Sequence, residues 1–253
     1  MNALSIVITI VVIVLILMLL RYLFSDPNTL QNIQSGQTSS TIPSSSLATN
    51  GSSVPSSNFA YSVWIYVNDW NYRYGEPKVI FGRMGAQSAP GSGSVPGVSG
   101  MDPCPAVVLD AIENNLSISL GCYPGINQQP TTPGGNTVVH TCNIANIPIQ
   151  KWVNIIVSVY GRSMDVYIDG KLVRTCLLPG VANVNNNSNV YVTPSGGFDG
   201  YTAKLQYYPN ALNPQQAWNI YSQGYSNWLS MFNAYQLHIS LVENGKTQSS
   251  VTI

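Results

Sequence analysis

The sequence has very little charge. Only 8% of its 253 residues are charged, 10 of them basic and 10 acidic, and the formal net charge is zero. An average soluble protein has roughly 25% charged residues, so the polar surface must come from Asn, Ser, Thr, Gln and Tyr. Without a basic excess we expect no nucleic-acid partner, because binding to phosphates depends on it. So low a charge suits secreted proteins and large packed assemblies.

Recognisable nucleophile and zinc patterns are also missing. The sequence has 2 histidines, His140 and His238, and both lie in strand-like stretches. No Ser or Cys nucleophile motif accompanies either of them, and their spacing fits no zinc pattern. We expect both to be ordinary strand residues.

Charge is absent altogether from Met1 to Leu20, and most of these residues are apolar. At 1.5 Å per residue, about 20 residues span the ~30 Å hydrocarbon core of a bilayer. A cleaved signal peptide would need a basic start and a small-residue cleavage site, whereas this run starts Met-Asn-Ala and ends in RYLFSDP. The sequence predicts an uncleaved transmembrane anchor over 1–24. Arg21, partly offset by Asp26, gives a slight preference for a cytoplasmic body.

The stretch from Ser25 to Ser57 has few large apolar residues and no hydrophobic periodicity. Such a composition cannot bury enough surface to fold alone. We therefore expect a flexible Ser/Thr/Asn-rich tether over 25–57, with a root-mean-square reach of roughly 30 Å.

The remainder, 58–253, is typical of an all-β domain. Strand-like runs rich in aromatic and β-branched residues recur between turn signals; they are 58–70, 105–122 (a hairpin turning near Glu113), 137–144, 151–160, 164–176, 189–195, 201–209 and 234–253. One short helix is expected, with Asn213 as N-cap, Pro214 in the first turn and Gly224 at the end. This order of elements favours an antiparallel sandwich or barrel. Two long loops, Met84–Pro103 and Tyr123–Asn136, are candidate contact surfaces.

The hairpin MDVYIDGKLVRTC, Met164–Cys176, turns at Asp169-Gly170. Asp-Gly is a strong signal for a two-residue turn, because both central residues need a positive φ. A regular ladder then places Ile168 opposite Lys171, Val166 opposite Val173 and Asp165 opposite Arg174, the last an ordinary cross-strand ion pair.

The segment KWVNIIVSVYGRSMDVYIDGKLV resembles the central signature of laminin-G-like domains in the concanavalin A-like lectin/glucanase superfamily. FAYSVWIYV is similar to the family's opening strand, and GFDGYTAKLQYYPNALNPQQAWNIYSQG to its ending. The likeness covers most of Asn58 to Gly224 and implies a jelly-roll of two packed antiparallel sheets. In architecture and composition, the anchored domain also resembles structural proteins of large DNA viruses.

Glucanases of that superfamily carry a Glu-x-Asp-x-Glu type motif, one carboxylate acting as nucleophile and the other as acid/base. The chain's 10 carboxylates do not form this motif, and the close pairs Asp110/Glu113 and Asp165/Asp169 flank turns. We expect no catalytic residue and no enzymatic activity.

The resemblance leaves two kinds of ligand open. Calcium is a candidate because many relatives use it, and it needs converging oxygens from loops such as those that carry Asp69, Asp102 and Asp199. Glycans bind exposed rings and amides on loops. The candidate contact residues for a glycan or a partner are Trp70, Tyr72 and Tyr74.

The 4 cysteines allow three pairings. A hairpin centred on Glu113 places Cys104 opposite Cys122, which leaves Cys142 to pair with Cys176. Disulfides imply an oxidising site of assembly, contrary to the slight cytoplasmic preference. Cytoplasmic DNA viruses that carry their own thiol oxidases would reconcile the two. Asn50, Asn115 and Asn186 are glycosylation sequons, usable only in a lumenal body.

Two functions from different classes follow. The first is a non-enzymatic, single-pass structural protein of a virion, a minor capsid protein linking the lipid membrane to the protein shell. The alternative is a membrane-tethered, carbohydrate-binding lectin, with or without calcium. The first accounts for the anchor, the long loops and the low charge together.

Overall fold

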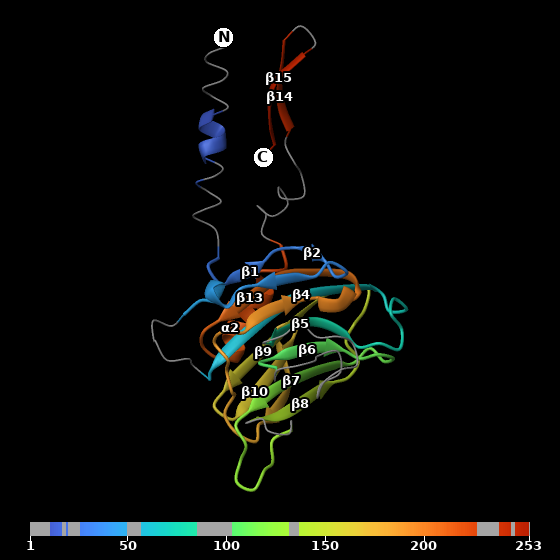
Figure 1. The fold of residues 1–253 in the computed structure, drawn as a ribbon, viewed down its shortest axis with the longest axis vertical. Helices are drawn as coiled ribbons and strands as arrows, with labels where there is room; N and C mark the ends of the chain where they lie inside the picture. The colour runs from blue at the N-terminus through green and yellow to red at the C-terminus, as the bar shows by residue number, and fades with distance from the viewer. Residues whose placement is uncertain are drawn as a thin grey trace. The chain divides into compact units, whose positions relative to one another are not determined.

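The computed structural model describes residues 11–16, 19, 26–49, 57–84, 103–131, 137–226, 238–243 and 246–252. The chain forms two compact units, one over Pro27–Tyr225 and one drawn from the chain ends, Met1–Asp26 and Ser226–Ile253. The first unit is an antiparallel β-sandwich, and its strands can be followed by colour and label in Figure 1.

One sheet of the sandwich has seven strands in the order β1-β13-β4-β9-β10-β11, with β2 also paired to β13. All its pairings are antiparallel. The strands are β1 (Thr29–Gln31), β2 (Gln34–Ser35), β4 (Phe59–Asp69), β9 (Trp152–Tyr160), β10 (Ser163–Ile168), β11 (Lys171–Leu177) and β13 (Asp199–Tyr208).

The second sheet has six strands in the order β3-β12-β5-β6-β7-β8, again antiparallel. Its strands are β3 (Ser40–Ile42), β5 (Lys78–Met84), β6 (Ala106–Leu109), β7 (Leu116–Cys122), β8 (Val138–Ile144) and β12 (Asn189–Val192). Two short 3-10 helices, η1 (Ser44–Ser46) and η2 (Pro194–Gly196), lie in its connections. The predicted all-β, jelly-roll-like sandwich is confirmed; β5 was not among the expected strands.

The main core lies between the sheets. Alternate residues of β4, among them Phe59, Val63 and Val67, enter it together with Leu109 and Leu116 from the other sheet. This alternation follows from the period of two in a strand. On the opposite face of the seven-stranded sheet, Ile156 and Tyr167 are covered by the helix.

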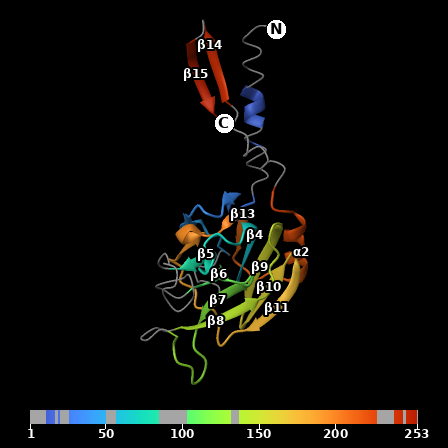
Figure 2. The same ribbon diagram turned by 90° about the vertical axis from the view of Figure 1, so that its right-hand side faces the viewer.

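That helix, α2 (Pro214–Ser222), begins and ends close to where the sequence predicts. The Asn213 side chain accepts from the Gln216 backbone at 2.8 Å, and Gln216 Oε1 accepts from the Asn213 backbone at 2.9 Å. This capping box fixes the first turn. Ala217 and Ile220 then pack on Ile156 and Tyr167 of the seven-stranded sheet, and Figure 2 shows α2 beside β9–β11.

The predicted flexible tether is wrong for residues 27–49. There the chain forms β1, β2 and β3, which pair with β13 and β12. The segment is too polar to fold alone, but it takes its hydrogen bonds from sheets that already exist. Leu47 is buried and Leu30 packs against the core. The sandwich therefore begins near Pro27 rather than Asn58.

The end of the sandwich also differs from the prediction. It ends near Tyr225, and β14 (His238–Glu243) pairs only with β15 (Lys246–Thr252) in a two-stranded sheet that belongs to the other unit. In the predicted anchor, residues 11–16 and 19 are helical, and the others lie outside the described residues. Within the part of the chain that the structure describes, no helix has the length and apolar character to cross a membrane.

Candidate functional site

The two sides of the sandwich are built differently. On one side, which we call the closed side, β1 and β2 extend the seven-stranded sheet beyond β13, and β3 extends the six-stranded sheet beyond β12. On the other, the open side, β11 and β8 end the two sheets. A disulfide between Cys142 of β8 and Cys176 of β11, with a Cα–Cα distance of 6.2 Å, joins these two edges. The predicted Cys142–Cys176 bridge is confirmed.

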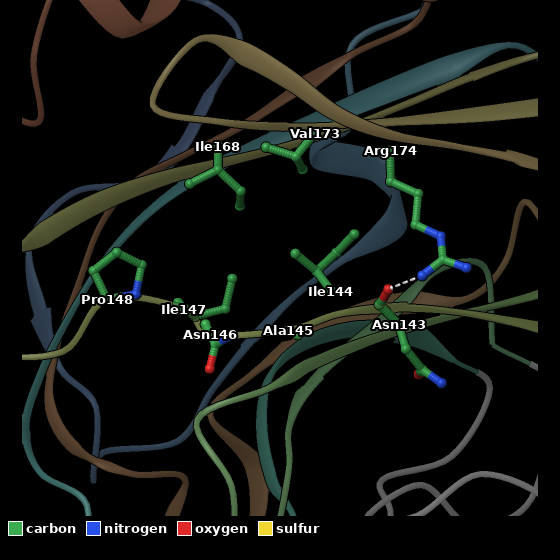
Figure 3. Close-up of a pocket in the computed structure, with 9 residues that line it drawn as sticks. All are labelled: Asn143, Ile144, Ala145, Asn146, Ile147, Pro148, Ile168, Val173 and Arg174. Carbon is green, nitrogen blue, oxygen red and sulfur yellow. Dashed lines mark hydrogen bonds between the residues drawn. The ribbon is translucent and has the colours of Figure 1, made fainter.

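A cleft of about 380 Å³ opens between the sheets beside this disulfide. Figure 3 shows its two walls, one from the β10–β11 hairpin and one from the end of β8 and the loop after it. Ile144 and Ile147, both on the second wall, are buried. The lining residues are Asn143, Ile144, Ala145, Asn146, Ile147, Pro148, Ile168, Val173 and Arg174. The cleft is therefore aliphatic, with polar groups at its rim.

A β-bulge in β11 creates one wall of the cleft. The ladder pairs Ile168 with Lys171 as predicted, but then shifts, so that Val166 faces Arg174 and Asp165 faces Thr175. Val173 is the extra residue, and consequently both Val173 and Arg174 line the cleft. Redirecting a side chain is a common effect of a bulge.

The predicted Asp165–Arg174 pair is therefore wrong. Thr175 Oγ1 donates to Asp165 Oδ1 at 2.6 Å, while Arg174 Nη1 donates to the carbonyl of Asn143 at 2.6 Å (Figure 3). Within the described residues, ion pairs join Arg73 to Glu76 and Lys151 to Asp169, and none involves Arg174. Arg174 is thus an exposed cation at the rim of an aliphatic cleft.

The turn at Asp169-Gly170 is confirmed, with φ of 50° and 72°. Asp169 is tied to β9 in both directions: its N–H donates to the Asn154 carbonyl, and its Oδ1 accepts from the Asn154 N–H, each at 2.9 Å. A Cβ on Gly170 would lie 2.9 Å from Tyr221 Cβ. Asp169 therefore has a structural role, as expected.

The predicted Cys104–Cys122 disulfide is wrong, because both thiols are free and buried. In the β6–β7 ladder Ala106 pairs with Ser119, which places Gly121 rather than Cys122 beside Cys104. Burial raises the pKa of the Cys104 thiol to about 12 and that of Cys122 to about 11. Both therefore remain protonated, and unreactive, at neutral pH.

The aromatic loop after β4 gives its three candidate residues different surroundings. Trp70 packs against the main core, and its Nε1 donates to the Ile112 carbonyl at 2.8 Å. The Lys78 ammonium lies 4.8 Å from the Trp70 ring centroid. Tyr72 is half-buried, whereas Tyr74 is 59% exposed. Only Tyr74 of the three therefore offers a largely exposed ring.

The acidic residues considered for calcium are only partly brought together. Asp69 and Asp199 are paired in the β4–β13 ladder, and Asp102 lies outside the described residues. Asp199 accepts from Asn68 and Gln37 at 3.0 and 2.9 Å. The described ranges contain no group of three His, Cys, Asp or Glu residues placed to hold a metal ion. Calcium binding stays a prediction.

Sequence reasoning did not find the cleft. Its aliphatic residues look like ordinary strand residues, and the bulge has no clear sequence signature. The usable signal was the cysteine pair, because a bridge between Cys142 and Cys176 must bring β8 and β11 together.

Comparison with known proteins gives a match in fold. No protein-family model matches the chain, and no curated protein matches it in sequence. The receptor binding domain of botulinum neurotoxin D is similar, with a TM-score of 0.50 and 13% identity over 77% of this chain and 44% of that one. The receptor binding domain of the C/D mosaic serotype is similar too, with a TM-score of 0.50 and 14% identity over 76% and 43%. At such identity the likeness shows the fold, and the match spans less than half of each solved chain.

Proposed function

We propose that the protein is a non-enzymatic, single-pass structural protein of a virion, a minor capsid protein that links the lipid membrane to the protein shell. Its sandwich is assigned to the concanavalin A-like, laminin-G-like group on the sequence signature quoted above. In this proposal the chain needs no cofactor, and its partners are the membrane and neighbouring shell proteins.

The observation that carries the proposal is the short connection between the apolar run and the sandwich. The run ends at Leu20, and β1 begins at Thr29. The intervening stretch of about eight residues can span at most about 28 Å when fully extended. A domain so connected is kept near the membrane surface. This suits a fixed link between two layers better than a receptor that samples distant ligands.

The bonding of the acidic residues supports a non-enzymatic role. Asp69 accepts from the Asn71 backbone, Asp110 from the Ile112 backbone and Glu113 from Asn115. Asp165 bonds Thr175, and Asp169 bonds the Asn154 backbone. These carboxylates stabilise turns and ladders, which leaves them poorly placed as an acid/base pair.

Membrane extraction tests the anchor. The full chain and a version lacking residues 1–24 are expressed in the same cells, and membranes are washed with alkaline carbonate. We expect the full chain to remain with the membranes and the truncated chain to be released, folded and with the same disulfide. Release of the full chain would show that 1–24 is no anchor.

Crosslinking tests the link to a shell. In particles purified from the native source, a lysine-independent photo-crosslinker should join the protein to a shell protein while it remains in the membrane fraction. Crosslinks confined to lipid, or absence of the protein from particles, would contradict the virion role.

A membrane-tethered lectin is the second candidate, favoured by the exposed ring of Tyr74. A glycan array probed with and without calcium separates the two proposals. Robust, competable binding that is lost in Tyr74→Ala would support the lectin and overturn the purely structural role. In that comparison Tyr160→Ala is the matched control, because Tyr160 is 68% exposed and lies at the end of β9.

A further inference from the structure

The closed side of the sandwich shows how its sheets accept an extended segment. There the N-terminal stretch adds β1 and β2 to β13 and adds β3 to β12. Leu30 packs against the core, and Ile42 is only 9% exposed. Short strands thus pair with an edge through their backbones and direct an aliphatic side chain toward the gap between the sheets.

The open side presents the same two features without such a segment in the described chain. β11 is the last strand of its sheet, and six of its seven residues are exposed. A strand paired beyond β11 would direct every second side chain to the inner face of that sheet. The inner face at this edge leads to the cleft, where Val173 and Ile144 form opposite walls.

The charge at this edge is of one sign. β11 reads KLVRTCL and carries Lys171 and Arg174 but no acidic residue. A guanidinium has five N–H donors, and the Asn143 carbonyl accepts from only one Arg174 nitrogen. Arginine forms its strongest pairs with carboxylates, which can accept two parallel hydrogen bonds. The edge is therefore complementary to a segment with acidic side chains.

The lining also distinguishes between kinds of ligand. None of the nine residues around the cleft is aromatic, and six of them are aliphatic or proline. Sugars are commonly held by aromatic side chains with a few placed polar groups, whereas an aliphatic cleft beside a free sheet edge fits a peptide strand. The observations favour a polypeptide over a glycan here.

We propose that the open side binds an extended segment of a partner protein whose inward-facing residues are both aliphatic and acidic. The segment pairs with β11 as an added strand, an aliphatic side chain enters the cleft, and a carboxylate binds Arg174. The inference rests on the proposed function, since it takes the partner to be a protein. The bulge at Val173 would then serve binding, because it places both Val173 and Arg174 at the cleft.

A peptide array tests the proposal with the full chain in detergent. Eight-residue synthetic peptides carry Thr at outward positions and every combination of Glu, Lys, Val and Asn at inward positions. We expect peptides that combine Glu and Val to bind at least tenfold more tightly than those that combine Lys and Val. N-methylation of the alternate amides that face β11 should abolish binding, because it removes the backbone hydrogen bonds.

The matched variants are Arg174→Glu and Arg162→Glu. Arg174→Glu should reverse the preference toward the lysine peptides. Arg162 is also exposed, but it bonds the Leu178 carbonyl outside the cleft, so Arg162→Glu should leave the preference unchanged. Melting curves confirm that each variant is folded.

Several outcomes overturn the proposal. The first is that no class of peptide binds the protein more tightly than a control peptide with Thr at every position. The others are an unchanged peptide preference in folded Arg174→Glu and full binding by the N-methylated peptides. The first would mean that Lys171 and Arg174 only protect the sheet edge from aggregation, a common use of basic residues there. Since the array needs no membrane, its failure is distinct from a failure of the membrane-extraction test.

Discussion

The closed and open sides of the sandwich solve one problem in two ways. Both sheets must end somewhere, and an edge exposes unpaired backbone groups and the gap between the sheets. The closed side covers its edges with residues 29–42 as added strands. The open side instead joins β8 to β11 through the Cys142–Cys176 disulfide. A covalent bond holds two edges together without filling the space between them, and the cleft lies on that side.

The largest expected effect comes from removing the side chains that secure the closed side. The double variant Ile42→Ala, Leu47→Ala should lower the free energy of unfolding by about 4 to 6 kcal/mol, because each substitution leaves a cavity in the core. Urea unfolding measures the loss. Ile33→Ala in the same segment is the control, since Ile33 is 55% exposed and its substitution should cost less than about 0.5 kcal/mol. Equal losses in the two variants would mean that the segment does not pack as described.

The next effect concerns the disulfide on the open side. Replacing both Cys142 and Cys176 by Ala should cost about 3 to 4 kcal/mol, the chain-entropy expectation for a bridge across 34 residues. Reductant should lower the unfolding midpoint of the natural chain and leave that of this variant unchanged. Cys104→Ala, which keeps the bridge, must remain sensitive to reductant. If the natural chain is insensitive, the open side is held by packing alone.

The smallest effect compares one hydroxyl on each side. On the closed side, buried Thr193 Oγ1 donates to the Thr38 carbonyl at 2.7 Å, so Thr193→Val should cost about 1 to 2 kcal/mol. On the open side Thr175→Val removes the exposed bond to Asp165, and we expect a loss below about 0.5 kcal/mol because water replaces that bond. Both are exchanges of β-branched residues, which keeps the backbone preference constant. A larger loss at Thr175 would reverse the order of the two sides.

The features that the sequence predicts well are local ones. The Asp169-Gly170 turn and the Asn213 cap each depend on a few neighbouring residues with specific backbone requirements. The sandwich itself follows from strand-like runs of regular spacing. The Cys142–Cys176 bridge was predicted as the pair left over after Cys104–Cys122, and it forms although that first pair does not.

The features that it misses depend on partners distant in the chain. Residues 29–42 look disordered because their own composition cannot sustain a strand, yet the edges of β13 and β12 supply the missing hydrogen bonds. A small shift in the pairing register of two strands also changes which side chains meet. The bulge at Val173 moves Arg174 away from Asp165, and a half-residue error in the centre of the β6–β7 hairpin separates Cys104 from Cys122. The cleft follows from the bulge, so it was beyond the reach of pattern reasoning.

The N-terminal strands also determine how the molecule responds to mechanical load. Tension applied through Asp26 reaches the sandwich first at β1, which bonds β13 over two residue pairs, and then at β2 and β3. The hydrogen bonds of such short ladders break one strand at a time, starting from the N-terminus, and they can form again when the tension falls. At the opposite edge the Cys142–Cys176 disulfide joins β8 to β11, so these strands cannot separate in this way. Under strain the domain would therefore lengthen at its N-terminal strands while the edge bearing the cleft keeps its shape.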